Sequence, residues 1–294
     1  MSADVNAKEE MRIGYLGPQG TYSEEVILHL YQGLNSDRKK IFLPFHNISA
    51  TIKAAANGEV DECAVPIENS LEGSVNITLD TLAHEVDLPI VKEIVWPISH
   101  NLLVKGEGKN IDQIISHPQA LAQCRKYLEK NYPRAKVTPV DSTSEAVYLV
   151  AGGKKNAAAI GSARSAKIYD LKILASGIED NKNNSTRFVV IRKEPSLPAA
   201  ECAGGIFKTS VICQIEGNSP GSLCAVLQEF AGRQVNLTRI ESRPARTGLG
   251  QYIFFLDMEG SIADKNVRES MEAVRKQSVM FKNLGSYSVA QIKK

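Results

Sequence analysis

The C-terminal part of the chain carries the pattern that most constrains the fold. The run TSVICQI (209–215) is strand-like and leads into the turn residues NSPG (218–221). Apolar residues then recur at i, i+3, i+4 and i+7, which is the spacing of one buried helix face: Leu223, Val226, Leu227 and Phe230.

Two further strands, VNLTRIESRP (235–244) and GQYIFFLDMEG (250–260), are joined around Gly248. A second amphipathic helix follows, marked by Val267, Met271 and Val274, and GSYSVA (285–290) ends the last predicted strand. The predicted order is β-α-β-β-α-β, which is a ferredoxin-like unit.

A segment without helical or strand periodicity precedes this unit. RKEPSLPAAECAGG (192–205) contains two prolines and a glycine pair, which favours a linker. We therefore expect one domain over residues 11–192, a linker over 193–206 and a second domain over 207–294.

Short apolar strands alternate with helical patterns in the first domain, which predicts an α/β fold with a largely parallel sheet. The strands are RIGYLG, ECAVPI, NLLVKG and AAAIGS, and the helix SATIKAAANG closes with Asn57-Gly58. Two stretches, 90–103 and 171–191, are expected to carry the chain between two lobes.

Composition excludes several classes of protein. A chain of 294 residues with 43% hydrophobic and 23% charged residues is long enough for two domains, and its net charge of +2 gives no case for nucleic-acid binding. No apolar run is long enough for a membrane span, and the polar N-terminus does not resemble a secretory signal. The five cysteines never form C-x-x-C, so we expect reduced cysteines, no metal site and a cytoplasmic location.

The stretch GPQGTYSEE (17–25) follows the first strand. Thr21 and Glu24 have the spacing of a capping box, while the helix start also offers backbone N–H groups to an anion. Taken alone, a simple cap is the better interpretation of Thr21 and Ser23. The glycines do not form G-x-G-x-x-G, which excludes a dinucleotide site.

Other polar groups stand where strands give way to helices. Asn69 and Ser70 are typical of an Asx-type turn, and Ser116 or His117 is expected to cap a helix that begins at Pro118. Ser142 and Glu145 form a second capping-box pattern. Arg187 is suited to a carboxylate but would equally be a surface arginine.

Taken together, the motifs resemble a known family. GPQGTYSEE, PIENSLEGSV, HPQALAQC, AAAIGS and NSTRF, in this order, closely resemble prephenate dehydratase, the enzyme that makes phenylpyruvate from prephenate. SPGSL (219–223) and LTRIESRP (237–244) resemble the regulatory ACT domain of the same enzymes.

The resemblance implies a bilobal catalytic domain like that of periplasmic binding proteins, with the active site in the cleft, and a homodimer or homotetramer. It implies that Thr186 is catalytic, that no cofactor or metal is needed, and that the cleft binds prephenate. The substrate-binding residues that it implies are Thr21, Asn69, Ser70, Gln119 and Arg187. With a dicarboxylate as substrate, we expect Thr21 and Ser23 both to cap the helix and to bind an anion.

The resemblance also implies L-phenylalanine as an allosteric effector between paired regulatory domains. The residues expected to bind it are Asn218, Pro220, Gly221, Ser222 and Leu223 at one turn, and Glu241, Ser242, Arg243 and Pro244 on the next strand. The chain has STSEAV (142–147) where the family is often richer in alanine, and GSL (221–223) where the regulatory motif often reads G-A-L.

The residue types suggest a mechanism based on placement and hydrogen bonding. We expect Thr186 to donate to the leaving hydroxyl, with His117 or Glu68 as a titratable partner and Arg187 on the pyruvyl carboxylate. Three alternatives remain open: an arogenate dehydratase, a non-catalytic binding protein and an amino-acid sensor.

Overall fold

The computed structural model describes residues 10–31, 38–193, 206–215 and 220–292. Two compact units are formed: unit 1 from Met1–Thr51, Ala64–Val75 and Val95–Phe188, and unit 2 from Ile52–Cys63, Asn76–Ile94 and Val189–Lys294. Strands β3 (Glu62–Asn69), β5 (Ile90–Pro97) and β11 (Ser185–Arg192) each begin in one unit and end in the other. The expected division at 193–206 stays a prediction, because 194–205 lie outside the described residues.

The N-terminal strands of unit 1 form part of a mixed sheet. β1 (Glu10–Leu16) pairs in parallel with β2 (Lys39–Phe45), and α1 (Tyr22–Tyr31) connects them. On its other side β1 neighbours β3, whose end pairs with the short β4 (Gly73–Ser74). After β2 the chain enters α2 (Ile48–Asn57), which ends at Gly58 as predicted, with a φ of +76°.

A second sheet of five strands completes unit 1, in the order β10-β6-β9-β7-β8. The chain reaches it between β5 and β6 and leaves it between β10 and β11, within the two stretches expected to link lobes. The strands are β6 (Asn101–Val104), β7 (Gln113–Ser116), β8 (Lys136–Pro139), β9 (Ala157–Gly161) and β10 (Lys172–Ala175).

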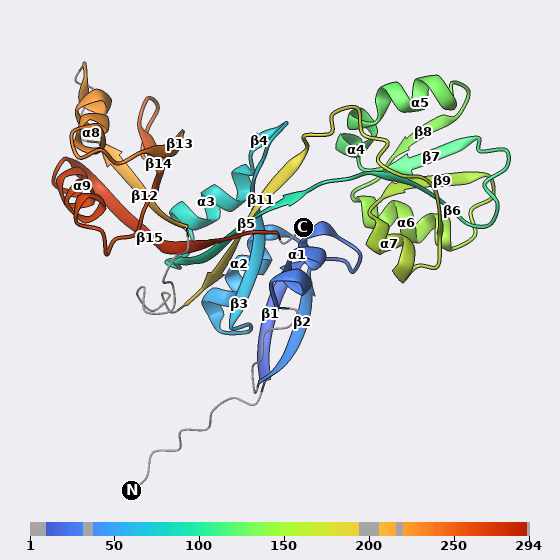
Figure 1. The fold of residues 1–294 in the computed structure, drawn as a ribbon, viewed down its shortest axis with the longest axis horizontal. Helices are drawn as coiled ribbons and strands as arrows, with labels where there is room; N and C mark the ends of the chain where they lie inside the picture. Colours follow the sequence, from blue (N-terminus) through green and yellow to red (C-terminus); the bar gives the residue numbers. More distant parts are fainter. Residues whose placement is uncertain (1–9, 32–37, 194–205, 216–219, 293–294) are drawn as a thin grey trace, which may run out of the picture. The chain divides into compact units, whose positions relative to one another are not determined.

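Helices cover both faces of this sheet (Figure 1). Ala158 and Ile160 of β9 pack in a core with α4 (Pro118–Gln123) and α5 (Arg125–Asn131). Ala157 and Ala159 pack in another core with α6 (Thr143–Ala151) and α7 (Ala163–Ile168). Burial on both faces explains why the sequence here is an unbroken apolar run.

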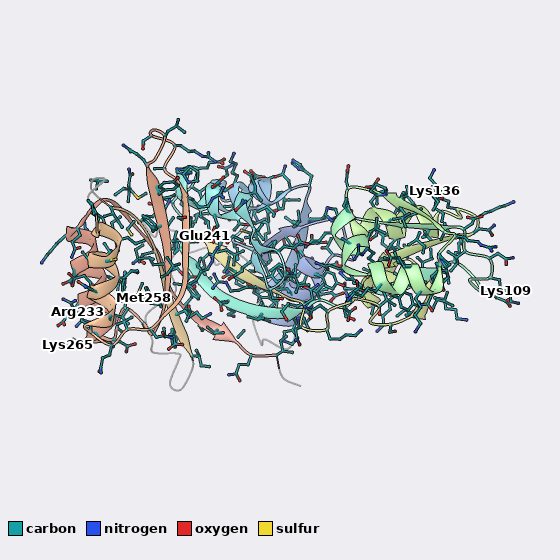
Figure 2. The ribbon with its side chains drawn as sticks, turned by 90° about the horizontal axis from the view of Figure 1, so that it is seen from above. Lys109, Lys136, Arg233, Glu241, Met258 and Lys265 are labelled. Carbon is teal, nitrogen blue, oxygen red and sulfur yellow. The ribbon has the colours of Figure 1, made fainter. Side chains whose placement is uncertain are left out.

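Residues 207–290 form the predicted β-α-β-β-α-β unit within unit 2. Its strands run in the order β13-β14-β12-β15, and α8 and α9 share one core with them, to which Met258 contributes (Figures 1 and 2). The elements are β12 (Phe207–Ile215), α8 (Ser222–Ala231), β13 (Leu237–Pro244), β14 (Tyr252–Glu259), α9 (Lys265–Lys276) and β15 (Ser278–Ala290).

β15 spans Ser278–Ala290, so GSYSVA (285–290) is the end of the last strand, as predicted. The pairing with β12 moves from Ser210↔Gly285 to Val211↔Asn283, so Leu284 is the extra residue of a β-bulge. Gly285 has a φ of +107° at this irregularity. The bulge breaks the alternation that a regular strand would show.

β15 also joins the β-α-β-β-α-β unit to the rest of unit 2. Its residues Ser288 to Ala290 pair in parallel with residues 92–94 of β5. Lys208 of β12 places its ammonium 2.6 Å from a carboxylate oxygen of the fully buried Glu93. The helix α3 (Asn76–His84) belongs to the same unit.

Within the described ranges, no helix has both the length and the apolar character needed to cross a membrane. The same ranges contain no group of three or more His, Cys, Asp or Glu residues arranged to hold a metal ion. Cys63, Cys124, Cys213 and Cys224 are free thiols, and Cys202 lies outside the described residues.

Candidate active site

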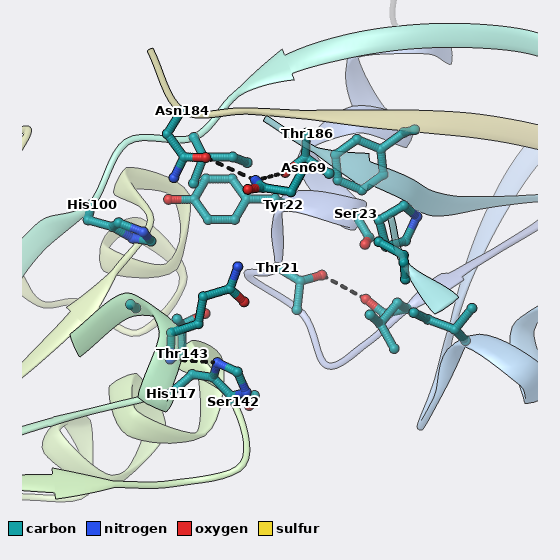
Figure 3. Close-up of a pocket in the computed structure, with 18 of the residues that line it drawn as sticks. Thr21, Tyr22, Ser23, Asn69, His100, His117, Ser142, Thr143, Asn184 and Thr186 are labelled. Atoms are coloured by element: carbon teal, nitrogen blue, oxygen red, sulfur yellow. Dashed lines mark hydrogen bonds between the residues drawn. The ribbon is translucent and has the colours of Figure 1, made fainter. Parts of the chain in front are cut away.

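A pocket of about 480 Å³ lies within unit 1. That volume falls in the range of small-molecule sites. Its wall combines helix starts, strand ends and three histidines, and Figure 3 shows the polar side chains that point into it. The residues that line it include Thr21, Tyr22, Ser23, His46, Ile48, Asn69, Val75, His100, His117, Gln119, Gln123, Asp141, Ser142, Thr143, Asn184 and Thr186.

The lining contains no lysine and no arginine among the described residues. It does contain the first residues of three helices of nine or ten residues: α1, α2 and α6. Because the first N–H groups of a helix have no partner within it and carry partial positive charge, these starts attract anions. The pocket is therefore suited to a carboxylate without a formal cation on its wall.

Two of these helix starts use the same capping arrangement. Thr21 Oγ1 accepts from the backbone N–H of Glu24 at 3.3 Å, and Ser142 Oγ accepts from that of Glu145 at 3.0 Å. Each glutamate then accepts from the N–H just before the cap, at Gly20 and at Asp141. Both predicted capping boxes are therefore helix caps. They differ from the standard capping box in one respect: the glutamate accepts from the N–H of the residue before the cap and not from that of the cap itself.

The hydrogen of the Thr21 hydroxyl is already donated within the protein. Besides accepting from Glu24, the hydroxyl donates to the carbonyl oxygen of Leu16 at 2.8 Å (Figure 3). A substrate anion would therefore meet the first N–H groups of α1 rather than this hydroxyl. Ser23, one residue into the helix, is buried on the pocket wall.

Asn69 and Thr186 meet directly in the pocket. The Asn69 Nδ2 group donates to Thr186 Oγ1 at 2.9 Å and to Asn184 Oδ1 at 2.9 Å (Figure 3). Its Oδ1 atom accepts from the backbone N–H groups of Leu71 and Glu72. Those two backbone donors fix the orientation of the amide, so the Thr186 oxygen accepts from Asn69 and keeps its own hydrogen for the pocket.

The same chain of amides continues across the pocket. Asn184 Nδ2 donates to Gln123 Oε1 at 2.9 Å, and the Nε2 atom of His100 lies 2.8 Å from the same oxygen. Tyr22 packs edge-on against the His100 ring and donates to the carbonyl oxygen of Ser99. Burial raises the pKa of Tyr22 well above its ordinary value.

The structure does not bring every expected residue to the pocket. On β11, Thr186 and Phe188 line the pocket, whereas Arg187 between them does not. Neighbouring side chains of a strand point to opposite faces. Arg187 is buried, and its Nε atom lies 3.4 Å from a carboxylate oxygen of Glu68. Ser70 also lies off the lining and donates to the carbonyl oxygen of Asn183.

Ser116 or His117 was expected to cap α4, and the cap is His117. Its Nδ1 atom accepts from the backbone N–H of Gln119 at 3.3 Å, which leaves only Nε2 for other chemistry. Ser116 instead donates to the carbonyl oxygen of Ile160. His117 and Gln119 both line the pocket.

Sequence reasoning missed several residues of the wall, among them Tyr22, His46, His100, Gln123, Thr143 and Asn184. Gln123 lies one helical turn after Gln119, which is a usable signal once α4 is placed beside the pocket. His100 and Asn184 lie outside the helices and strands and follow no periodic pattern, so only the fold reveals them.

The residues expected to bind an effector fall at two places in unit 2. Gly221 caps α8 with a φ of +89°, and Pro220 beside it is exposed. On β13, Ser242 and Pro244 are exposed, while Glu241 and Arg243 are half-buried on the opposite side. Arg243 forms a bidentate pair with Asp80 of α3. Asn218 lies outside the described residues.

Comparison with known proteins agrees with this arrangement. Residues 13–196 match the family described as prephenate dehydratase, and residues 209–276 match the ACT domain. A prephenate dehydratase of Methanocaldococcus jannaschii is 40% identical, over 94% of this chain and 97% of that protein.

Solved structures show the same fold. A prephenate dehydratase of Arthrobacter aurescens in complex with L-Phe has a TM-score of 0.83 and 34% identity, over 94% of this chain and 90% of that one. GqqA, described as a novel type of quorum-quenching acylase, has a TM-score of 0.81 and 26% identity, over 95% and 98%. With a matching family over most of its length and an ACT domain behind it, the chain belongs to the prephenate dehydratase family.

Proposed function

We propose that the pocket of unit 1 binds prephenate and that the Thr186 hydroxyl assists departure of the substrate hydroxyl. Prephenate carries a carboxylate on a quaternary ring carbon and a hydroxyl across the ring. Loss of carbon dioxide and hydroxide makes the ring aromatic and gives phenylpyruvate. The driving force lies in the substrate, so the protein must position it and stabilise the leaving oxygen.

One observation carries the role of Thr186. Asn69 donates to the Thr186 oxygen at 2.9 Å, and backbone N–H groups hold Asn69 in that orientation. The hydroxyl hydrogen of Thr186 is therefore directed at a pocket ligand, and a hydrogen bond received at its oxygen makes a hydroxyl a better donor. Thr186 then donates to the negative charge that develops on the leaving oxygen.

The carboxylates are bound by helix starts in this proposal. A dicarboxylate needs positive potential, and the described lining offers the starts of α1, α2 and α6 but no arginine or lysine. An arginine clamped on the ring carboxylate would stabilise the ground state and oppose decarboxylation. Helix dipoles stabilise the bound anion by a smaller amount, which leaves the carboxylate free to lose its charge.

Arg187 has a different role in this proposal from the one suggested by its sequence motif. Its place beside Glu68, away from the pocket lining, supports a structural role in holding β11 to β3. Thr21, Ser23, Asn69 and Gln119 remain proposed substrate-binding residues because they line the pocket. Ser70 supports the end of β11 by bonding to Asn183 and Ser185.

We propose L-phenylalanine as the effector of the ACT domain, with the α8 turn and β13 as its site. The Arthrobacter relative described as a complex with L-Phe supports this ligand. β13 is the outer strand of its sheet and exposes Ile240, Ser242 and Pro244, which supports pairing with a second copy in a homodimer or homotetramer. The free thiols support a cytoplasmic location.

The test is an assay of one purified protein with three substrates. Prephenate should give phenylpyruvate, whereas arogenate should give phenylalanine if the amino-acid analogue is preferred. A substrate with an acyl group that an acylase can remove tests the activity named in the description of GqqA. Thr186→Ala serves as the site control, since it should abolish the true activity. Turnover of arogenate or of the acylated substrate alone would overturn the assignment.

A further inference from the structure

His100 is a buried histidine for which the proposed chemistry has no direct use. It lies between β5 and β6, its residue is 4% exposed, and it lines the pocket (Figure 3). Its Nε2 atom lies 2.8 Å from Gln123 Oε1. Thr186 is reached from it only through three amide side chains in sequence.

The direction of every bond in that chain follows from one end. Backbone N–H groups orient the Asn69 amide, so Asn69 donates to Asn184 and Asn184 donates to Gln123. Gln123 uses its Nε2 group on a carboxylate oxygen of Glu72, at 3.3 Å. Gln123 Oε1 is therefore an acceptor, and the hydrogen between it and His100 belongs to the histidine.

This assignment fixes the tautomer of His100 and disfavours its cation. The neutral ring carries its hydrogen on Nε2, and Nδ1 is buried with no hydrogen-bond partner among the described residues. Protonation would add a buried donor with no acceptor, which is costly. Burial lowers the pKa of His100, although its bond to Gln123 and the carboxylate of Glu179 act in the opposite direction.

The charged groups around His100 are few. Glu179 accepts from the His100 backbone N–H at 2.8 Å and is itself paired with Lys182 at 3.2 Å. Glu72 is reached through Gln123, and Tyr22 packs against the ring. None of these four side chains accepts a hydrogen bond from Nδ1, so the neutral ring is the form that suits this environment.

We propose that neutral His100 is a positioning residue: it holds Gln123, and through Asn184 it holds in place the Asn69 amide that donates to the Thr186 oxygen. This inference rests on the proposed function of Thr186. In this proposal His100 affects kcat through other side chains and does not contact the reacting atoms. Protonation leaves the Nε2–H bond available but adds a buried Nδ1–H with no acceptor among the described residues, which displaces the ring from Gln123, so activity should fall as the pH drops through the titration of His100.

The test compares three variants of the full chain in steady-state kinetics from about pH 4 to about pH 8, a window that reaches below the ordinary histidine range because burial lowers the pKa of His100. His100→Gln places an amide N–H where the histidine has Nε2–H, His100→Asn places it near Nδ1, and His100→Leu provides none. We expect kcat to fall roughly tenfold in the Asn and Leu variants, as for loss of one hydrogen bond, with KM within about twofold. His100→Gln should retain most of kcat and lose the acid limb of the wild-type pH profile.

Two results would overturn the inference. The first is wild-type kcat in His100→Leu or His100→Asn, and the second is the same acid limb in His100→Gln as in the wild type. The Gln and Asn variants differ by one methylene, so a general loss of stability, checked by Tm, would affect both alike. If Thr186→Ala is inactive while His100→Asn is normal, only this inference fails. If the wild type does not turn over prephenate, the proposed function fails first.

Discussion

The pocket of unit 1 and the junction of β13 with α3 in unit 2 are built on opposite principles. The pocket is held by amides, hydroxyls and helix starts, with no lysine or arginine on its described lining. The junction is held by ions: Arg243 donates to both oxygens of Asp80 at 2.9 Å and to Asn76 at 2.9 Å, and Arg246 donates to Asp80 as well.

The difference follows from what each region does in the proposed function. Neutral groups fix the direction of hydrogen bonds without stabilising a substrate carboxylate that has to be lost. A bidentate, half-buried ion pair gives a contact that is strong in one geometry and weak in others. Val75 lines the pocket, and the next residue, Asn76, begins α3, so the junction holds the helix that continues the pocket loop.

The largest expected loss of kcat follows removal of the proposed hydrogen-bond donor, the Thr186 hydroxyl. Thr186→Ala should lower kcat by about 10²- to 10⁴-fold, the usual contribution of a positioned proton donor, with little change in KM. Thr186→Ser keeps the hydroxyl and should retain more activity than Thr186→Val, which keeps the shape. Steady-state kinetics with phenylpyruvate as the readout measures this. Near-normal kcat in Thr186→Ala would remove Thr186 from the mechanism.

The second-largest loss of kcat is expected for Asn69→Asp, because this change keeps the size of the side chain but replaces the Nδ2 donor with an acceptor. Thr186 would then donate to the introduced carboxylate, and its hydrogen would no longer serve the substrate. We expect kcat to fall about tenfold or more, and a higher KM from repulsion of the substrate carboxylates.

A double-mutant cycle with Thr186→Ala sharpens this result. If Asn69 acts through Thr186, the two losses in kcat will be far from additive. Additive losses would mean that Asn69 acts on the substrate independently.

At the junction, Asp80→Asn should leave kcat unchanged and weaken inhibition by phenylalanine, by about fivefold or more if Asp80 carries the coupling. High salt should weaken inhibition in the wild type in the same direction, since half-exposed ion pairs are screened. Glu269→Gln on α9 is the matched control, because it makes the same change of charge at an exposed pair with Lys265. Equal inhibition constants in wild type and Asp80→Asn would show that the pair is only structural.

The smallest effect on catalysis is expected for Arg187→Lys. Its guanidinium lies beside Glu68 and off the pocket lining, so KM should change less than about twofold. Loss of guanidinium geometry in a buried setting should instead lower Tm by about 2–4 °C for each kcal/mol lost. A selective rise in KM at unchanged Tm would restore the carboxylate-binding role suggested by its sequence motif.

The fold was predictable from the sequence where residues within a single helix or strand determine its structure. The faces of α8 and α9 followed from apolar spacing, and the end of α2 followed from Asn57-Gly58. The bulge at Leu284 could not be predicted from spacing, because it interrupts the alternation of β15.

The site was predictable only in part. Asn69 and Thr186 belong to motifs, but their hydrogen bond joins positions 117 residues apart. Asn184 lies two residues before Thr186, Gln123 and His100 come from two other segments, and no local spacing marks Asn184 or His100. Arg187 was expected at the pocket because its motif identifies the strand but not which alternate side chains face the pocket.

The helix starts that line the pocket also bear on how the product leaves. Their dipoles are part of the backbone and keep their orientation after the reaction, whereas the ligand changes from a dianion to a monoanion when carbon dioxide departs. The helix start that faced the ring carboxylate then meets an uncharged aromatic ring and attracts it less. Binding of the substrate and release of the product are therefore favoured by the same fixed field, without any movement of a charged side chain.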